Sequence, residues 1–335
     1  MRRTQEGLRL TAEEPPKQLD LPPLFPDKLT SYFMISEKTG MTISETPIAA
    51  PAPAQRLPSA SLPDQPLIRI RPSRRWSFLD LHDIWAHREL FYFLVWRDVK
   101  VRYKQTVLGA SWVILQPLLM TIIFMVFLGM IIRVQTPGVP YPLFLYSALL
   151  PWTFFSNAVA SSSYSVVANA TVINKVYFPR VLIPAAVVTV RLYDFLIAFV
   201  ILGGAIVFYG IHPGWTILLL PLLVAELTFL ALAIGLWLAA ANVKYRDVGT
   251  IVPVMLQLWM FVTPIVYPSS YVPERWRTIY DLNPLAGIID NFRASLLGLP
   301  INRLSLIVSV LTTLVLLVYA AHVFRRVEDE FADLV

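Results

Sequence analysis

The sequence predicts an all-α polytopic membrane protein with six transmembrane helices. Of its 335 residues, 56% are hydrophobic and only 15% are charged, whereas a soluble domain is typically about 25% charged. The apolar residues gather after residue 105 in runs long enough to cross about 30 Å of hydrocarbon as helices. These runs do not alternate in polarity, as the strands of a membrane barrel would.

Six apolar runs are predicted as spans, and each is bounded by charged or turn-forming residues. They cover about residues 108–132, 143–164, 181–209, 216–241, 249–267 and 304–323. Five of the six contain proline, which removes a helix hydrogen bond and can kink a span. An even number of spans places both termini on one side. The lysines and arginines beside the spans favour the cytoplasm for that side.

The first 75 residues form a separate, Pro-rich segment with the run IAAPAPAQRLP and mixed charges. They bury little apolar area, and no apolar signal segment is visible among them. We therefore expect a disordered cytoplasmic tail, with a docking role as the alternative. Residues 76–335 then form the membrane domain.

A dense charge cluster directly precedes the first span, in VWRDVKVRYKQTVLGASWVILQP over residues 95–117. Placed on a helix, an apolar stripe is flanked by charges on both sides, which is typical of a helix lying in the membrane interface. The stripe is Tyr92, Trp96, Val99 and Tyr103, and the flanking charges are Arg97, Asp98, Lys100, Arg102 and Lys104. We predict an interface helix over residues 85–104, with a polar linker as the alternative.

Two connections on the same side also resemble docking surfaces. NATVINKVYFPR, residues 169–180, predicts a short helix with an apolar face of Val172, Ile173, Val176 and Tyr177. A short helix outside the membrane needs a groove to bury such a face. NVKYRDVG, residues 242–249, is the second connection. For both, an ordinary solvated connection is the alternative.

The outer segment 271–300 contains its own short helix. Asn283-Pro284 is an N-cap followed by proline at the first helical position. An apolar stripe then follows at three- and four-residue spacing, made of Leu285, Ile288, Ile289, Phe292 and Leu296. About fourteen residues are too few to cross a bilayer, so we predict an interfacial or re-entrant helix.

The sequence lacks the motifs of several chemistries. It has no phosphate-binding G-x-x-x-x-G-K-[ST] loop, no G-x-G-x-x-G, no H-E-x-x-H and no cysteine, and its four histidines are scattered. We expect no metal site and no bound cofactor. The net charge of +6 comes largely from basic residues beside spans, so nucleic acid is not an expected partner. Active work would draw its energy from an ion gradient or from a partner protein.

Three ionisable residues lie within the spans. Arg191 and Asp194 are three residues apart on one helical face and can neutralise each other, whereas Glu226 stands alone. A proton or ion relay is one interpretation. A structural pair plus one isolated carboxyl is favoured, because relays tend to be chains of such groups.

Aromatic residues gather in the first, second and fifth spans. Interface belts account for part of them, and the rest are candidates to line a passage, where rings and hydroxyls can hold sugars. The polar run SNAVASSSYS, residues 156–165, would supply the hydroxyls.

Five blocks of this sequence, taken in order, resemble the permeases of type-2 ABC exporters. The similarity is to the class that exports polysaccharides and polyol phosphates: O-antigen, capsule and teichoic-acid exporters. It runs from about residue 85 to the end. The blocks are WRDVKVRYKQTVLGASWVILQP, PYPLFLYSALLPWTFFSNA, NKVYFPRVLIP, NVKYRDVGTIVPVMLQLWMFVTPIVYP and YDLNPLAGIIDNFR.

The resemblance implies a homodimer in the bacterial inner membrane with two copies of a separate ATPase, which binds ATP and Mg. The cargo would be a lipid-linked polysaccharide. Implied interface-helix residues are Trp96, Arg97, Lys100, Arg102, Tyr103 and Lys104. Implied ATPase-coupling residues are Ile173, Asn174, Lys175, Val176, Tyr177, Phe178, Pro179 and Arg180. Implied channel residues are Trp112, Tyr141, Tyr146, Trp152, Phe154, Phe155 and Trp259.

Three alternatives remain from the sequence. An exporter of another amphiphile, such as a drug or lipid, is the nearest. An integral-membrane glycosyltransferase would need acidic residues clustered on one loop, and here they are scattered. A gradient-driven carrier would transport without any ATPase.

Overall fold

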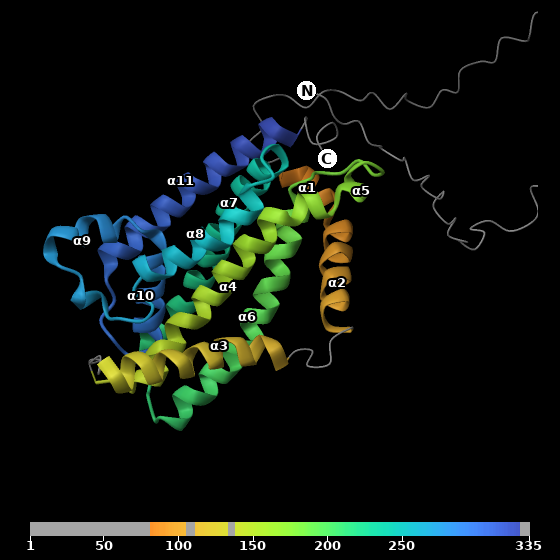
Figure 1. Cartoon of the computed structure of the whole chain (residues 1–335). Coiled ribbons are helices and arrows are strands. Elements are labelled where there is room, and N and C mark those ends of the chain that lie inside the picture. The colour runs from red at the N-terminus through yellow and green to blue at the C-terminus, as the bar shows by residue number, and fades with distance from the viewer. Residues whose placement is uncertain (1–80, 105–110, 133–137, 329–335) are drawn as a thin grey trace, which may run out of the picture. The chain divides into compact units, whose positions relative to one another are not determined.

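The computed structural model describes residues 81–104, 111–132 and 138–328, and every regular element within these ranges is helical (Figure 1). Five segments are long and apolar enough to cross a membrane: Ser111–Met130, Tyr141–Ala168, Leu182–Phe208, Trp215–Lys244 and Arg303–Glu328. The predicted all-helical, multi-span class is therefore confirmed. The Pro-rich tail lies outside the described residues.

The predicted span 249–267 forms a shorter helix, α8 (Val248–Val262). It ends there because Pro264 disfavours helical backbone at the residue before it, and Thr263 is extended with ψ 145°. Fifteen residues rise about 22 Å as a helix, less than the hydrocarbon thickness. The described residues thus hold five long spans and one short apolar helix, and the six-span count stays a prediction.

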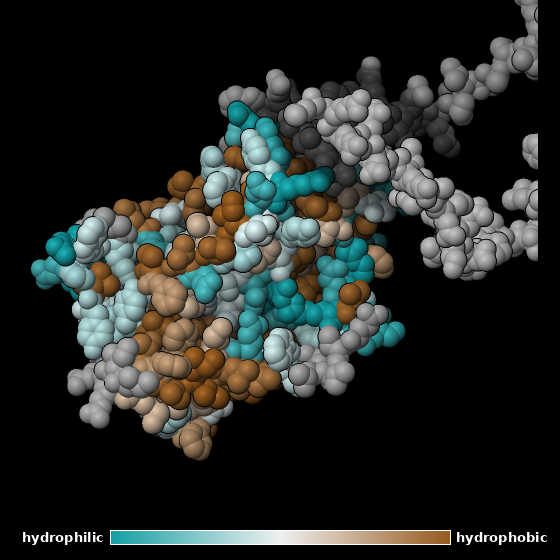
Figure 2. Space-filling model, in the orientation of Figure 1, coloured by the Kyte–Doolittle hydropathy of each residue, from teal (hydrophilic) through white to brown (hydrophobic). Residues whose placement is uncertain are grey.

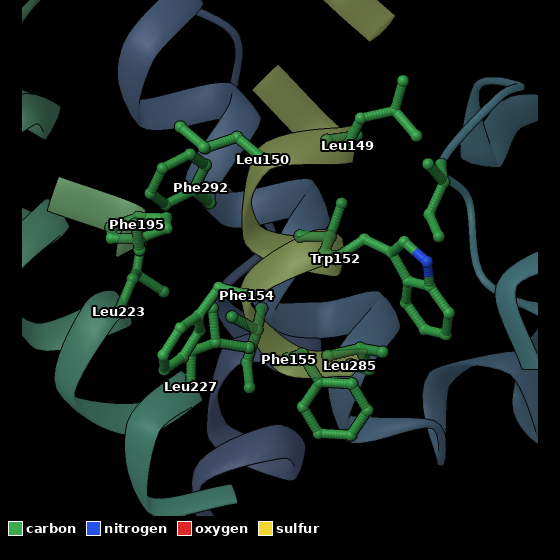
Figure 3. Close-up of a cluster of buried hydrophobic side chains, with 14 of the residues drawn as sticks. Leu149, Leu150, Trp152, Phe154, Phe155, Phe195, Leu223, Leu227, Leu285 and Phe292 are labelled. Atoms are coloured by element: carbon green, nitrogen blue, oxygen red, sulfur yellow. The ribbon is translucent and has the colours of Figure 1, made fainter. Parts of the chain in front are cut away.

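The centre of the fold is α4 (Tyr141–Ala168), which packs against α6 (Leu182–Phe208), α7 (Leu220–Lys244) and α3 (Ser111–Phe124). In the most apolar stretch of α4, 78% of the residues are buried, whereas the corresponding share in the first span is 11%. Aromatic and leucine side chains fill the space between these helices (Figure 3). Phe155 meets Trp259 edge-on at 5.4 Å between ring centroids, and Phe154 lies 5.5 Å from Phe195.

The first span lies at the periphery of the subunit. Its helix changes from α-helix in α3 to π-helix in η1 (Met125–Ile132). Gly129 permits a close approach of η1 to α4. A Cβ at that position would lie 2.7 Å from the ring of Tyr141, closer than two carbons can pack. This contact holds the far end of the first span against the core.

The predicted short outer helix is α10 (Pro284–Leu297), and it is buried on all sides. Asn283 caps it by accepting from the Leu285 N–H at 3.2 Å, and Gly298 ends it with φ 69°. It packs against α4, α7 and α11 (Arg303–Glu328). Every residue of α10 except Asp290 is buried within the subunit, and its placement at the membrane interface or as a re-entrant helix stays a prediction.

Four described segments meet at one end of the bundle, which we call the α5 end. It consists of α1 (Leu81–Ala86), α5 (Ala170–Ile173), the turn between α7 and α8, and the last turns of α11 (Figure 1). Ile173, Phe178, Val243 and Phe324 belong to one buried cluster there. The three segments predicted to share one side therefore do lie together at this end.

Candidate transport and coupling sites

The predicted interface helix begins earlier than expected and is broken at His87, giving α1 and then α2 (Arg88–Lys104). The residues that it buries against the protein lie outside the predicted apolar stripe, which was expected to face the membrane. Leu94 and Val95 are buried in the cluster at the α5 end, whereas Tyr92 and Trp96 are exposed and stack on each other at 6.4 Å. Contact with α6, rather than helical periodicity, selects the buried face.

The charged C-terminal end of α2 reaches the middle of α6. An Arg102 nitrogen lies 2.9 Å from Asp194 Oδ2, and the Tyr103 hydroxyl donates to Asp194 Oδ1 at 2.5 Å. Asp194 lies twelve residues after the start of α6, about 18 Å along the helix. The sequence placed these α2 side chains at the membrane surface, whereas the structure places them against a span.

The predicted Arg191–Asp194 pair is confirmed, with 3.6 Å between its charged atoms. It is the longer of the two ion pairs that Asp194 makes with arginine. Arg191 also donates to Ser161 Oγ at 2.6 Å, so the polar run on α4 supplies one of its partners. Neutralisation by a carboxylate and a hydroxyl lowers the cost of holding this arginine within a span.

These charged groups form one wall of a pocket between α2, α3, α4 and α6. Its polar lining residues are Arg102, Gln116, Thr153, Asn157, Arg191 and Asp194, and its apolar ones are Trp112, Val113, Pro117, Leu150, Phe154, Phe195 and Ala198. Several of these lining residues were predicted as site residues from the sequence. That they lie together could not be predicted, because no local spacing relates α2 and α3 to α6.

The predicted coupling segment has a different face from the one expected. Only Ala170–Ile173 is helical, as α5, and the chain then turns. Ile173 and Phe178 are buried, whereas Val176 is exposed and Tyr177 is 95% exposed. The predicted face of Val172, Ile173, Val176 and Tyr177 is therefore corrected. It assumed a continuous helical period, and residues after Ile173 do not follow one.

Side-chain bonds tie the coupling segment to two other helices. Arg97 on α2 donates to Asn169 Oδ1 at 2.9 Å. The Arg180 N–H donates to Glu328 Oε1 at 2.9 Å at the end of α11, and the Arg180 guanidinium donates to the Glu328 carbonyl. Asn174 and Lys175 are exposed, and Pro179 is half-buried. Movement of this segment would therefore act on α2 and α11.

The turn 242–249 is held by one buried amide. Asn242 donates through Nδ2 to the Ser163 carbonyl at 3.1 Å and accepts the Gly249 N–H at 3.0 Å. Tyr245 is exposed at the tip. This turn is therefore anchored to α4 and presents one aromatic side chain at the α5 end.

The predicted channel aromatics divide into two groups. Tyr146, Trp152, Phe154 and Phe155 are buried inside the subunit, and of these four only Phe154 lines the described pocket. Trp112 is 51% exposed. Trp259 and Tyr141 are half-buried and donate to Asn283 Oδ1 at 3.3 Å and to the Val266 carbonyl at 3.1 Å. The family resemblance implied these channel residues, and the structure packs most of them against neighbouring helices of the same subunit.

Glu226 is buried on α7 away from the pocket. Neither of its carboxylate oxygens has a hydrogen-bond partner among the described residues. A relay would need a neighbouring ionisable group, so this arrangement favours the isolated carboxyl over a proton pathway.

Arg293 lies on α10, within the outer segment 271–300, yet it is only 3% exposed. It donates to the carbonyls of Pro264 and Ile265 at 3.0 and 3.1 Å. Its guanidinium lies 3.6 Å from the Phe144 ring centroid and 3.4 Å from Asp290. Arg293 therefore fastens α10 to the turn that follows α8.

Burial shifts the pKa of both partners in this pair. Burial raises the pKa of Asp290 to about 6, although the Arg293 charge acts in the opposite direction. Burial lowers the pKa of Arg293 to about 10, although the Asp290 charge acts in the opposite direction.

Across the described ranges, no three histidine, cysteine, aspartate or glutamate side chains gather as a metal site would require.

Residues 89–297, from α2 to the end of α10, match the family described as ABC-2 type transporter. The chain belongs to this family. It is therefore the membrane-spanning subunit of a transporter and not an enzyme, as the resemblance predicted.

This chain aligns with nearly the whole length of several relatives, three of which are described here. The O-antigen export system permease protein RfbA of Myxococcus xanthus is 31% identical over 260 residues, 76% of this chain and 98% of the relative. The RfbA permease of Klebsiella pneumoniae is 30% identical over 239 residues, 71% of this chain and 92% of the relative. The polysialic acid transport protein KpsM of Escherichia coli is 24% identical over 252 residues, 70% of this chain and 91% of the relative.

Proposed function

We propose that this ABC-2 family member is the membrane subunit of an ATP-driven exporter that moves a lipid-linked polysaccharide across the bacterial inner membrane. The observation that carries the proposal is the similarity to O-antigen export permeases at 30–31% identity over 92–98% of their length. The similarity to a polysialic acid transport protein supports the same class of cargo, a polysaccharide.

Energy would come from a separate ATPase that binds ATP and Mg, because this sequence has no phosphate-binding loop of its own. The α5 end supplies a surface for it. Tyr177 projects almost fully into the surroundings while Phe178, its neighbour, is anchored in the core. An exposed aromatic on an anchored turn is suited to fill a partner's pocket, as interface hot spots do.

Force applied at Tyr177 would spread along the bonds already described. Through Asn169 it would reach Arg97 and α2, and through Arg180 it would reach Glu328 and α11. On this proposal, ATP-driven closure of the partner shifts α2 and α11 against the core.

The passage would lie between two copies of the chain. The first span is mostly unburied in the subunit, and α8 exposes Ile251, Val254, Met255, Leu258, Phe261 and Val262. These faces would meet the second copy or the cargo. Trp112 and the half-buried Trp259 are the aromatic residues placed to contact a sugar chain. Both termini would be cytoplasmic, on the ATPase side.

A coupling experiment tests the proposal at its most exposed point. The chain is reconstituted with its ATPase, and ATP-driven polysaccharide export is measured for Tyr177→Ala. We expect a large loss of export with little change in thermal stability. Tyr271→Ala, an exposed tyrosine of η3 (Ser269–Tyr271), is the matched control. Equal export by both variants would count against the assignment of the coupling segment.

A further inference from the structure

The pocket between α2, α3, α4 and α6 brings charged and polar side chains together near the middle of the α6 span. Four residues from four helices offer hydrogen-bond donors: Arg102, Gln116, Asn157 and Arg191. A single carboxylate, Asp194, stands against the two guanidinium groups. Charged groups within spans are rare and typically line pathways or bind ligands.

The partners of Asp194 are unequal. One oxygen takes Arg102 at 2.9 Å and the other takes the Tyr103 hydroxyl at 2.5 Å, which leaves Arg191 at 3.6 Å. Arg102, Tyr103 and Asp194 therefore form the tight unit that joins α2 to α6. The guanidinium of Arg191 is the more loosely paired cation, fixed mainly by Ser161.

An anion with several oxygens matches this wall. Arginine presents N–H groups in a planar fork that suits phosphate oxygens. The neutral amides of Gln116 and Asn157, on α3 and α4, can donate to further oxygens without adding charge. A tetrahedral phosphoryl group uses donors from several directions, whereas a planar carboxylate needs only one fork.

The rim of the pocket is apolar. Trp112 is half exposed there, and along α3 the side chains of Leu119, Met120, Ile122 and Ile123 are also exposed. In Figure 2 the surface over α3 is brown, with teal beside it over α2. A phosphoryl group in the pocket could thus carry an apolar body lying along α3.

We infer that the pocket lined by Arg191, Arg102, Asn157 and Gln116 is a binding site for a phosphoryl group. The group is the headgroup of an amphiphile or a free phosphate, and the experiment separates these sources. Only the identification of such an amphiphile with the exported cargo rests on the proposed function.

Binding is measured on the full chain in a neutral detergent, without ATPase or transport, so that its failure leaves the export proposal untouched. The probes are dioctanoyl phosphatidic acid, dioctanoylglycerol, which has the same tails without phosphate, and inorganic phosphate. We expect saturable binding of the phosphatidic acid and none of the diacylglycerol. If inorganic phosphate does not bind at the concentration at which the phosphatidic acid binds, the ligand is the headgroup of an amphiphile. Equal binding of both identifies free phosphate.

Variants with opposite expected signs keep a folding defect from imitating the result. Arg191→Gln should weaken phosphatidic acid binding about tenfold, since charge-assisted hydrogen bonds are lost. Arg191→Lys should keep part of the affinity. Asp194→Asn should tighten binding, because it removes the only carboxylate among the described lining residues. Arg303→Gln removes an exposed arginine at the start of α11 and serves as the matched control.

Three outcomes would overturn the inference. One is the absence of saturable binding of both phosphate-bearing probes. Another is an equal loss of affinity in Arg303→Gln and Arg191→Gln. The third is weaker binding in a folded Asp194→Asn variant, which would show that the charged cluster only joins helices.

Discussion

Arg97 on α2 donates a hydrogen bond of 2.9 Å to Asn169, 72 residues further along the chain. Asn169 ends α4 and begins the turn to α5, and its own amide donates to the Ser165 carbonyl at 2.8 Å. A single asparagine thus connects the helix before the first span with the segment that we assign to ATPase contact.

Loss of the connection should weaken both stability and export. For Arg97→Gln and Asn169→Ala, a double-mutant cycle on unfolding should give a coupling free energy of about 1 kcal/mol, as for other contacting pairs. ATP-driven export should fall in each single variant. Arg88→Gln, an exposed arginine of the same helix, is the control. A coupling energy near zero would show that the bond does not join the two segments.

The two aromatic neighbours of the coupling segment should behave oppositely. Phe178 is buried at 4% exposure and Tyr177 is 95% exposed. Phe178→Ala should therefore lower the free energy of unfolding by about 3–5 kcal/mol. Tyr177→Ala should change it by less than about 0.5 kcal/mol. Thermal unfolding in detergent distinguishes them, and equal effects would contradict the turn described after α5.

Asp290 should make stability depend on pH. Burial raises its folded-state pKa to about 6, above the ordinary value of about 3.9. Between these values the folded state holds more protons than the unfolded state, so stability contributed by this group falls as pH rises from about 4 to about 6. The difference in melting temperature between wild type and Asp290→Asn should show this fall. A difference that stays constant from pH 4 to 7 would refute it.

Glu226 should be dispensable for export. Its buried carboxylate has no hydrogen-bond partner among the described residues, so Glu226→Gln should keep or raise the melting temperature, since it removes a charge that burial penalises. ATP-driven transport should be unchanged. Abolished transport by a folded Glu226→Gln protein would revive the relay interpretation.

The long spans could be predicted from the sequence because the apolar length of a helix is a local property. The run 181–209 was predicted, and α6 covers Leu182–Phe208. The end of α8 was placed too late because Pro264 was read as a kink within a span. In the structure Thr263 before it is already extended, so the helix stops at Val262.

The candidate sites were less predictable because their contacts join distant segments. Arg102 and Asp194 meet through the packing of α2 on α6, which no residue spacing encodes. Arg293 is buried on α10, and nothing in the sequence indicates this burial. Its main partners are carbonyls 28 and 29 residues earlier in the chain, and backbone acceptors leave no signature in a sequence.

The most direct test of the central claim is transport by vesicles that contain this chain and its ATPase, with lipid-linked polysaccharide supplied on the ATPase side. The account predicts that polysaccharide crosses only when ATP and Mg are added, and that it does not cross when the ATPase is omitted or cannot hydrolyse ATP. Polysaccharide transport driven by an ion gradient in vesicles without the ATPase would contradict the account.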